Sequence, residues 1–449
     1  MLLSEFKPSI QFEPYINTGT IFDLNTGKFM PGYDAKWYLN GGLGLVTGIT
    51  GRAQTYKSSI AGSLLANCLM HYPESEALIY ETEFTIPDAE RYDEFVPETI
   101  SNRIAFHNRA TMDLGEFFET IKKIGELKLK NKKDLIRETP FLNPETSKPY
   151  RAWTPTFILC DSWSKAGSSK EDESYYKNKV DDSSMNMMYM QEGGIKTKIM
   201  RALPTLAHKY GLRIIMTGHV GSKTDLDPYN KTPKQLQYMK NTDKIKNVGS
   251  EFEFLTTTLM QVTGTTVLYS SDKKSNLYPY LDSPTNEVNE VSGIVVRCKN
   301  NAAGVSTPFV VSQYQGLLNA VTHFHFCRLH GDFGLKSSNK TYYSTIFDES
   351  KKITRKNIRE ITNKDYELCR AFELIAQLCY IKHYWPSFIY PTTGIDIDIV
   401  KIAEQLTTSK SIKISDILNS TGCWYFNDQK KNKRPYLSVW DVLELLHKK

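Results

Sequence analysis

The segment from Gly51 to Ser58 carries residue types that could bind a phosphate group. A strand-like run precedes it, and an amphipathic helix pattern follows it. A lysine can reach the outer phosphates of a nucleotide, a serine hydroxyl can hold Mg²⁺, and backbone N–H groups at a helix N-terminus attract anions. We therefore expect a phosphate-binding loop with its lysine at the surface, formed by Gly51, Arg52, Ala53, Gln54, Thr55, Tyr56, Lys57, Ser58 and Ser59.

Tyr56 stands at the position where phosphate-binding loops usually carry a second glycine. If the backbone there needs a positive φ, a tyrosine raises the free energy of the loop by about 1–2 kcal/mol. An ordinary glycine-containing loop before a helix is therefore an alternative interpretation of this segment.

Three later apolar runs each end in polar side chains suited to a nucleotide or a metal ion. The first is followed by Glu81 and Glu83, the second by Asp161 and the third by His219. Parallel strands present ligand-binding groups at their carboxyl ends. A glutamate there could polarise an attacking water, Asp161 could hold Mg²⁺ together with Ser58, and His219 could sense the γ-phosphate. This order of elements predicts an ATP-binding core of the RecA type.

The composition indicates a cytosolic, mildly basic protein of two or three domains. The chain has 449 residues and a net charge of +6, which permits a nucleic-acid partner without requiring one. Its seven cysteines form no CxxC pair and are expected to be reduced. The sequence shows no signal-peptide pattern and no apolar run long enough to span a bilayer, so we expect no membrane association and a cytoplasmic location.

The pattern along the chain predicts an α/β fold in three parts. Residues 1–43 are a Pro-, Gly- and Asn-rich lead-in that could contact another subunit. Residues 44–335 alternate strand-like and helix-like segments, which indicates a mainly parallel, twisted sheet. Residues 336–449 are expected to form a smaller, mostly helical domain. It ends near a basic hairpin, interpreted either as part of a small winged module or as an exposed hairpin, with Lys430, Lys431, Lys433 and Arg434 at its tip.

Two insertions, residues 164–194 and 221–249, have the composition of DNA-binding loops. Cationic side chains suit phosphates, and aromatic or methionine side chains suit unstacked bases of single-stranded DNA. Because these segments bury little apolar surface, we expect them to be poorly ordered without DNA. Disordered surface insertions are the alternative. The candidate DNA-binding residues are Met185, Met187, Tyr189, Lys223, Lys240, Lys244 and Lys246.

Two other clusters are expected to play no direct role. Residues 122–149 read as a basic helix with a solvated face, followed by a Pro-rich connection. His323 and His325 alternate along a run that reads as a strand, and this spacing does not favour a metal site.

Residues 45–335 resemble the RecA-like recombinases, and most closely the UvsX-type recombinases of large tailed phages. An aromatic residue directly before the loop lysine, here Tyr56 before Lys57, matches the UvsX-type form of the loop and accounts for the missing glycine. Other segments that resemble the family are residues 71–74, 78–84, 160–162, 168–171, 217–219, 295–301 and 422–425.

The resemblance implies an ATP-dependent DNA strand-exchange protein that coats single-stranded DNA as a helical filament and pairs it with double-stranded DNA. ATP and Mg²⁺ would lie between adjacent subunits, with single-strand-binding or loader proteins as further partners. Lys57 would bind the β- and γ-phosphates, and Ser58 and Asp161 would hold Mg²⁺. Glu83 would activate water and His219 would couple the γ-phosphate to the DNA loops. Lys299 would reach the γ-phosphate of the neighbouring subunit.

Two departures from the family leave other functions open. Asn301 stands where the family usually has a second basic residue, and the lead-in shows no clear polymerisation helix. A ring-forming DNA helicase motor and an ATP-switched DNA-binding assembly protein with little hydrolysis are therefore alternatives.

Overall fold

The computed structural model describes residues 12–83, 88–108, 112–167, 183–223, 234–271, 274–281, 283–339, 341–385, 397–426 and 434–445. For residues 183–190 it describes the backbone and not the side chains. Within these ranges, no helix is both long and apolar enough to cross a membrane.

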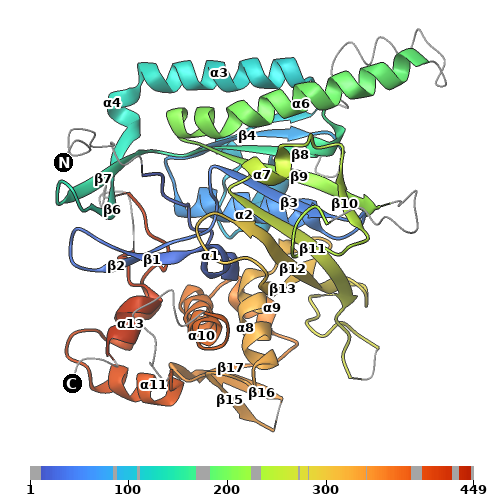
Figure 1. Cartoon of the computed structure of the whole chain (residues 1–449). Coiled ribbons are helices and arrows are strands. Elements are labelled where there is room, and N and C mark those ends of the chain that lie inside the picture. Colours follow the sequence, from blue (N-terminus) through green and yellow to red (C-terminus); the bar gives the residue numbers. More distant parts are fainter. Residues whose placement is uncertain are drawn as a thin grey trace.

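A ten-stranded sheet forms the centre of the molecule (Figure 1). Its strands run in the order β14-β13-β12-β11-β3-β9-β8-β4-β5, and β10 pairs with the end of β9. The six neighbours from β11 to β5 are mutually parallel, whereas β12, β13, β14 and β10 pair antiparallel. The predicted α/β class with a mainly parallel sheet is confirmed. The strands are β3 (Val46–Gly51), β4 (Glu76–Glu81), β5 (Ile104–Asn108), β8 (Thr156–Asp161), β9 (Leu212–Ser222), β10 (Asp243–Lys246), β11 (Thr258–Val267), β12 (Val288–Cys298), β13 (Ser306–Ser312) and β14 (Gly316–Leu317).

Helices cover both faces of the parallel part of the sheet. On one face, α2 (Lys57–His71) shares a buried cluster with Ile215 of β9. On the other face, α3 (Leu114–Lys130) and α6 (Ser183–Tyr210) pack with Ile214 and Met216 of the same strand. Consecutive side chains of a strand point to opposite faces, so a strand covered on both sides must be apolar almost throughout. This explains the apolar runs of β8 and β9 in the sequence.

The region 122–149 differs from its prediction. Lys128 of α3 is buried, and its Nζ donates to the Thr154 carbonyl at 2.8 Å, the Thr156 hydroxyl at 2.9 Å and the Gly211 carbonyl at 3.2 Å. After the short helix α4 (Lys132–Leu135), the expected Pro-rich connection is a hairpin of β6 (Ile136–Asn143) and β7 (Lys148–Trp153). The number of lysines in a segment does not show whether a given ammonium group is buried with three acceptors or exposed to water.

Replacing Lys128 with alanine should destabilise the protein by about 3 kcal/mol, because the three buried oxygens lose their shared donor. Urea denaturation of the purified variant measures this change. Lys123→Ala removes an exposed lysine of the same helix and should change stability by less than about 0.5 kcal/mol. A loss below about 1 kcal/mol in Lys128→Ala would show that other donors satisfy these oxygens.

The C-terminal part packs on the lead-in rather than folding around a core of its own. One buried cluster joins Leu24 of α1, Phe324 of α8, Phe372 of α10 and Val442 of α13, and so crosses both predicted domain boundaries. These helices gather below the central sheet in Figure 1. The lead-in contributes α1 (Ile21–Thr26), β1 (Lys28–Pro31) and β2 (Trp37–Asn40); the later helices are α7 (Phe252–Leu255), α8 (Asn319–Leu329), α9 (Ile358–Thr362), α10 (Tyr366–Tyr384), α11 (Ile399–Thr408), α12 (Ile414–Leu418) and α13 (Val439–Leu445).

Helices make up most of the regular structure in the described part of residues 336–449, and β15 (Leu335–Ser338), β16 (Tyr342–Thr345) and β17 (Asp348–Ile353) form a small antiparallel sheet beside them. One expectation nearby was wrong. His323 and His325 lie on helix α8 rather than on a strand; the helix is buried on nearly all sides, so its sequence shows no amphipathic period. His325 is hydrogen-bonded to Tyr278 and Glu290, each at 2.8 Å. The described residues contain no group of three or more side chains arranged to bind a metal.

Candidate nucleotide site at the sheet edge

The candidate phosphate loop, residues 51–57, connects the buried strand β3 to helix α2. The Thr55 hydroxyl donates to the Arg52 carbonyl at 2.8 Å and closes the loop on itself. Gln54 and Tyr56 have positive φ values of 59° and 61°. The position of the missing glycine therefore does adopt the left-handed conformation, which for tyrosine raises the free energy by about 1–2 kcal/mol.

Lys57 is buried rather than a surface group, with only 5% of its surface exposed. It is the first residue of α2, and this helix shares a buried cluster with the sheet. Its positive charge favours the ionised forms of both Glu83 and Asp161. The structure thus brings the loop lysine together with the two predicted carboxylates.

Asp161 ends β8 and is buried beside the loop. Its Oδ1 accepts a hydrogen bond from the Thr217 hydroxyl at 2.5 Å, whereas its buried Oδ2 has no hydrogen-bond partner among the described residues. Burial raises the pKa of Asp161, and the Thr217 and Ser58 hydroxyls oppose that rise. A buried carboxylate oxygen without a donor, next to a serine, fits a Mg²⁺ ion, which binds few protein ligands and keeps several waters.

Glu83 lies just beyond the end of β4, and its Oε1 is 2.7 Å from His219 Nε2. Its backbone N–H donates to Glu81 Oε1 at 2.6 Å, and this bond fixes the turn after the strand. The hydrogen bond from His219 lowers the pKa of Glu83 to about 2; burial opposes the shift, while the charges of His219, Lys57 and Lys165 favour it. Glu83 is therefore a fully ionised carboxylate that is engaged by His219.

His219 connects this site to strand β10. It pairs with Gly51 across the sheet and with Lys246 of β10. Its backbone N–H donates to the Ser164 hydroxyl at 2.9 Å, and that hydroxyl donates to the Lys246 carbonyl at 3.0 Å. These hydrogen bonds connect β10 to the residue that holds Glu83.

The predicted DNA loop 221–249 contains a strand among its described residues. Residues 243–246 form β10, since Asp243 and Ile245 are buried while Lys244 and Lys246 point outward. Lys240 is also exposed. Met239, Ile245 and Val248 belong to a buried cluster and provide apolar contacts that the overall composition of the segment did not reveal.

Asp243 is a residue of this region that the sequence analysis missed. It forms an ion pair with Arg52 of the candidate phosphate loop at 2.9 Å and accepts a hydrogen bond from Gln261 at 2.7 Å. A single acid among lysines gives no signal in the sequence. The contact ties β10 directly to the loop.

Several predicted DNA-binding residues cannot be placed. Residues 168–182, 224–233 and 427–433 lie outside the described residues, and with them Lys430, Lys431 and Lys433. The segment from 183 to 194 is the start of helix α6 and not a loop, which corrects that part of the prediction. The side chains of Met185, Met187 and Tyr189 lie outside the description.

Lys299 lies near the amino ends of the parallel strands, whereas the candidate phosphate loop lies at their carboxyl ends. Its backbone N–H donates to the Thr257 carbonyl at 2.9 Å. The next residue, Thr258 of β11, pairs with Cys298 on one side and with Thr47 of β3 on the other. Thr47 is four residues before Gly51, roughly 13 Å along the strand. Lys299 is therefore not part of the site formed by its own chain.

Asn301, which replaces the expected second basic residue, has a role within the chain. Its side-chain N–H groups donate to the Gly27 carbonyl at 2.6 Å and the Leu24 carbonyl at 3.3 Å. The neighbouring Asn300 donates to the Thr26 and Asn40 carbonyls. The two amides join the end of β12 to the lead-in.

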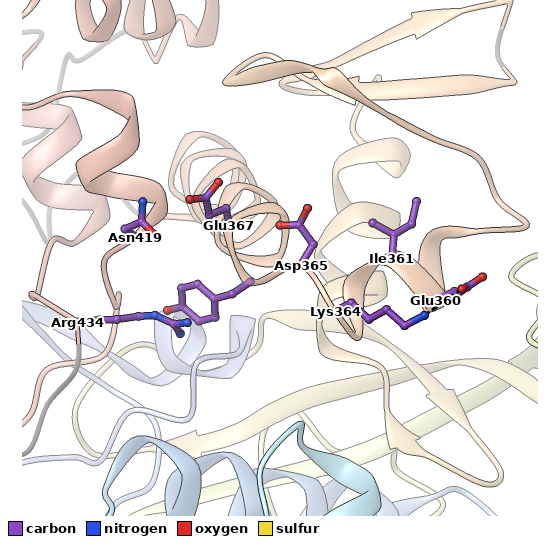
Figure 2. A pocket seen from close by; sticks show the side chains of 8 residues that line it. Glu360, Ile361, Lys364, Asp365, Glu367, Asn419 and Arg434 are labelled. Carbon is purple, nitrogen blue, oxygen red and sulfur yellow. Dashed lines mark hydrogen bonds and ion pairs between the residues drawn. The ribbon is translucent and has the colours of Figure 1, made fainter.

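A separate pocket of about 440 Å³ lies in the C-terminal region (Figure 2). The Arg434 guanidinium lies over the ring of Tyr366 there. None of its lining residues belongs to the candidate nucleotide site; they are Glu360, Ile361, Lys364, Asp365, Tyr366, Glu367, Asn419 and Arg434.

Fold and site together define an α/β protein with cationic, carboxylate and hydroxyl side chains gathered at the carboxyl edge of a parallel sheet. Comparison with protein-family models finds no match, and comparison with curated protein sequences finds none either.

Proposed function

We propose that this chain is an ATP-dependent DNA recombinase with a RecA-type core, which binds single-stranded DNA and promotes homologous pairing and strand exchange. The observation that carries the proposal is the meeting of Lys57, Asp161, Glu83 and His219 at one sheet edge, next to a loop that leads into a helix. Ligands of parallel α/β proteins bind at this edge.

Each residue has a role that suits its surroundings. Lys57 and the loop N–H groups would bind the phosphates, while Ser58 and Oδ2 of Asp161 would hold the metal ion. Bound Mg²⁺ would neutralise charge developing on the phosphates. Glu83, as an ionised carboxylate, accepts the proton of the attacking water.

The hydrogen bond between Glu83 and His219 suggests how DNA controls turnover. While His219 donates a hydrogen bond to Oε1 of Glu83, it stabilises the ionised carboxylate and so lowers its affinity for a proton from water. DNA bound at the exposed lysines of β10 displaces the strand and, through Ser164, His219. Glu83 is then released and hydrolysis accelerates.

ATP turnover with and without single-stranded DNA tests this function. We expect strong stimulation by DNA without unwinding of a duplex. Stimulated unwinding would favour the helicase motor instead. The third possibility is an ATP-switched assembly protein, which is supported by the hydrogen bond of Asn301 within its own chain. In that case DNA binding should require ATP, and almost no ATP should be hydrolysed.

The exposed lysines of β10 and its approach provide a test of the DNA path. Replacing Lys240, Lys244 and Lys246 with alanine should make the slope of log affinity against log salt less negative by about 2, because each contact to single-stranded DNA contributes about 0.7. Fluorescence anisotropy at several salt concentrations measures the slope. The control, Lys123→Ala with Lys130→Ala and Lys133→Ala, removes three exposed lysines from α3 and α4 and should leave the slope unchanged. An unchanged slope in the first variant would place the DNA elsewhere.

Since Lys299 lies far from the loop of its own chain, it can serve a nucleotide only in a neighbouring subunit. Lys299→Ala should retain ATP binding but lose DNA-stimulated hydrolysis and filament growth, as nucleotide state and subunit contact form one coupled equilibrium. Mixing this variant with Lys57→Ala should restore part of the activity, because some interfaces then combine an intact loop with an intact Lys299. No restoration in mixtures that co-assemble would exclude a shared site.

A further inference from the structure

Tyr56 holds a backbone conformation that a tyrosine does not adopt without support. It is the last residue before α2, with φ 61° and ψ 19°, and no side chain caps the helix at this point. The residue directly precedes Lys57, so its conformation sets the direction in which the helix and the lysine leave the loop. Strained residues persist where surrounding contacts over-determine them.

One supporting contact comes from strand β12, on the other side of β11, and the Gln313 side chain is a second partner of the Tyr56 hydroxyl. Asn289 Nδ2 donates a hydrogen bond to the Tyr56 hydroxyl at 2.8 Å. Asn289 is only 3% exposed and lies between Val267 of β11 and Val311 of β13. A buried amide needs a partner, and its alternatives, the Asn286 and Glu287 carbonyls, are both at 3.4 Å.

Asn289 is itself held in place from the C-terminal part of the chain. Two residues before it, Glu287 forms a bidentate ion pair with Arg359 of α9, at 2.6 and 2.9 Å. Both side chains are buried, and the Ser312 hydroxyl also donates to Glu287. The start of β12 is therefore a rigid point from which the Tyr56 hydroxyl is anchored.

We propose that Asn289 is a positioning residue for the nucleotide site, which keeps Tyr56 in its left-handed conformation and the loop ready for phosphate. This inference rests on the proposed nucleotide binding. Without the anchor, Tyr56 relaxes toward ordinary φ values and fewer molecules hold a binding-competent loop. The apparent affinity for nucleotide falls in proportion to the fraction of molecules that hold a binding-competent loop.

The positioning role of Asn289 is tested by comparing the effect of Asn289→Ala in the protein with Tyr56 and in the Tyr56→Gly protein. Asn289→Ala should weaken the binding of Mg·ADP, measured by calorimetry, by about fivefold, as expected for one lost neutral hydrogen bond. Tyr56→Phe should have the same effect, and combining the two should add nothing. In the Tyr56→Gly protein, Asn289→Ala should leave affinity unchanged, because glycine adopts positive φ without strain.

Hydrogen exchange of the amides of residues 51–57 without nucleotide gives a second readout. Asn289→Ala should speed exchange in the Tyr56 protein and leave it unchanged in the Tyr56→Gly protein. A merely structural role would change both backgrounds equally, and that result, or no change in the Tyr56 protein, would overturn the inference. If the unmodified protein fails to bind Mg·ADP while exchange follows the expected pattern, the proposed function fails and the positioning role stands.

Discussion

Replacing Glu83 with glutamine should lower the rate of DNA-stimulated ATP hydrolysis by about 10²- to 10⁴-fold while Mg·ATP still binds. The amide keeps the shape of the side chain but cannot accept a proton from water. Glu83 is ionised at the working pH because the hydrogen bond from His219 lowers its pKa to about 2, and release from His219 would raise its affinity for a proton. A steady-state phosphate-release assay measures the rate, and calorimetry measures the affinity.

The matched control is Glu126→Gln, which changes an exposed glutamate of α3 and should leave the rate unaltered. Normal turnover in Glu83→Gln would remove this residue from catalysis. Glu81, which is buried at the end of β4 and accepts the hydrogen bond from the Glu83 backbone, would then be the next candidate for the base.

Replacing Lys57 with alanine should weaken Mg·ATP binding about 100-fold or more, because charge-assisted hydrogen bonds to phosphate oxygens are lost. The fold should persist, since the described structure shows no hydrogen bond or ion pair of Lys57 that the substitution would break. Equilibrium binding of a fluorescent ATP analogue measures the affinity, and thermal unfolding checks the fold.

Lys57→Met separates charge from volume at this buried position. It fills nearly the same space without the ammonium, and we expect the same loss of affinity as for alanine. Binding that survives in Lys57→Met would show that the cavity, and not the charge, caused the loss in Lys57→Ala.

The sequence was a good guide to the strands that carry the candidate site. The parallel core could be predicted because β8 and β9 are buried on both faces and therefore contain apolar runs. Polar residues at their ends, such as Asp161 and His219, then follow from strand direction alone. This is why the members of the site could be named before their geometry was known.

Contacts between distant segments could not be predicted in this way. Tyr56 has a left-handed conformation, and its hydroxyl accepts a hydrogen bond from Asn289, 233 residues further along the chain. Lys128 is buried because three oxygens from other segments surround it. No local pattern distinguishes these residues from exposed ones of the same type.

Burial on all sides also misled the assignment of one element. The segment containing His323 and His325 has apolar residues on every face of α8, so the alternation of two histidines looked like a strand. Strand β10 was missed for the opposite reason, because its two buried residues, Asp243 and Ile245, are too few to form a visible pattern.

The most direct test of the central claim is strand exchange between circular single-stranded DNA and a homologous linear duplex, followed by gel electrophoresis. With ATP and Mg²⁺, the account predicts joint molecules that require homology and that disappear in Lys57→Ala. Joint molecules should also be absent without ATP. DNA-stimulated ATP hydrolysis with no joint molecules, or separation of the duplex without pairing, would contradict the assignment as a recombinase.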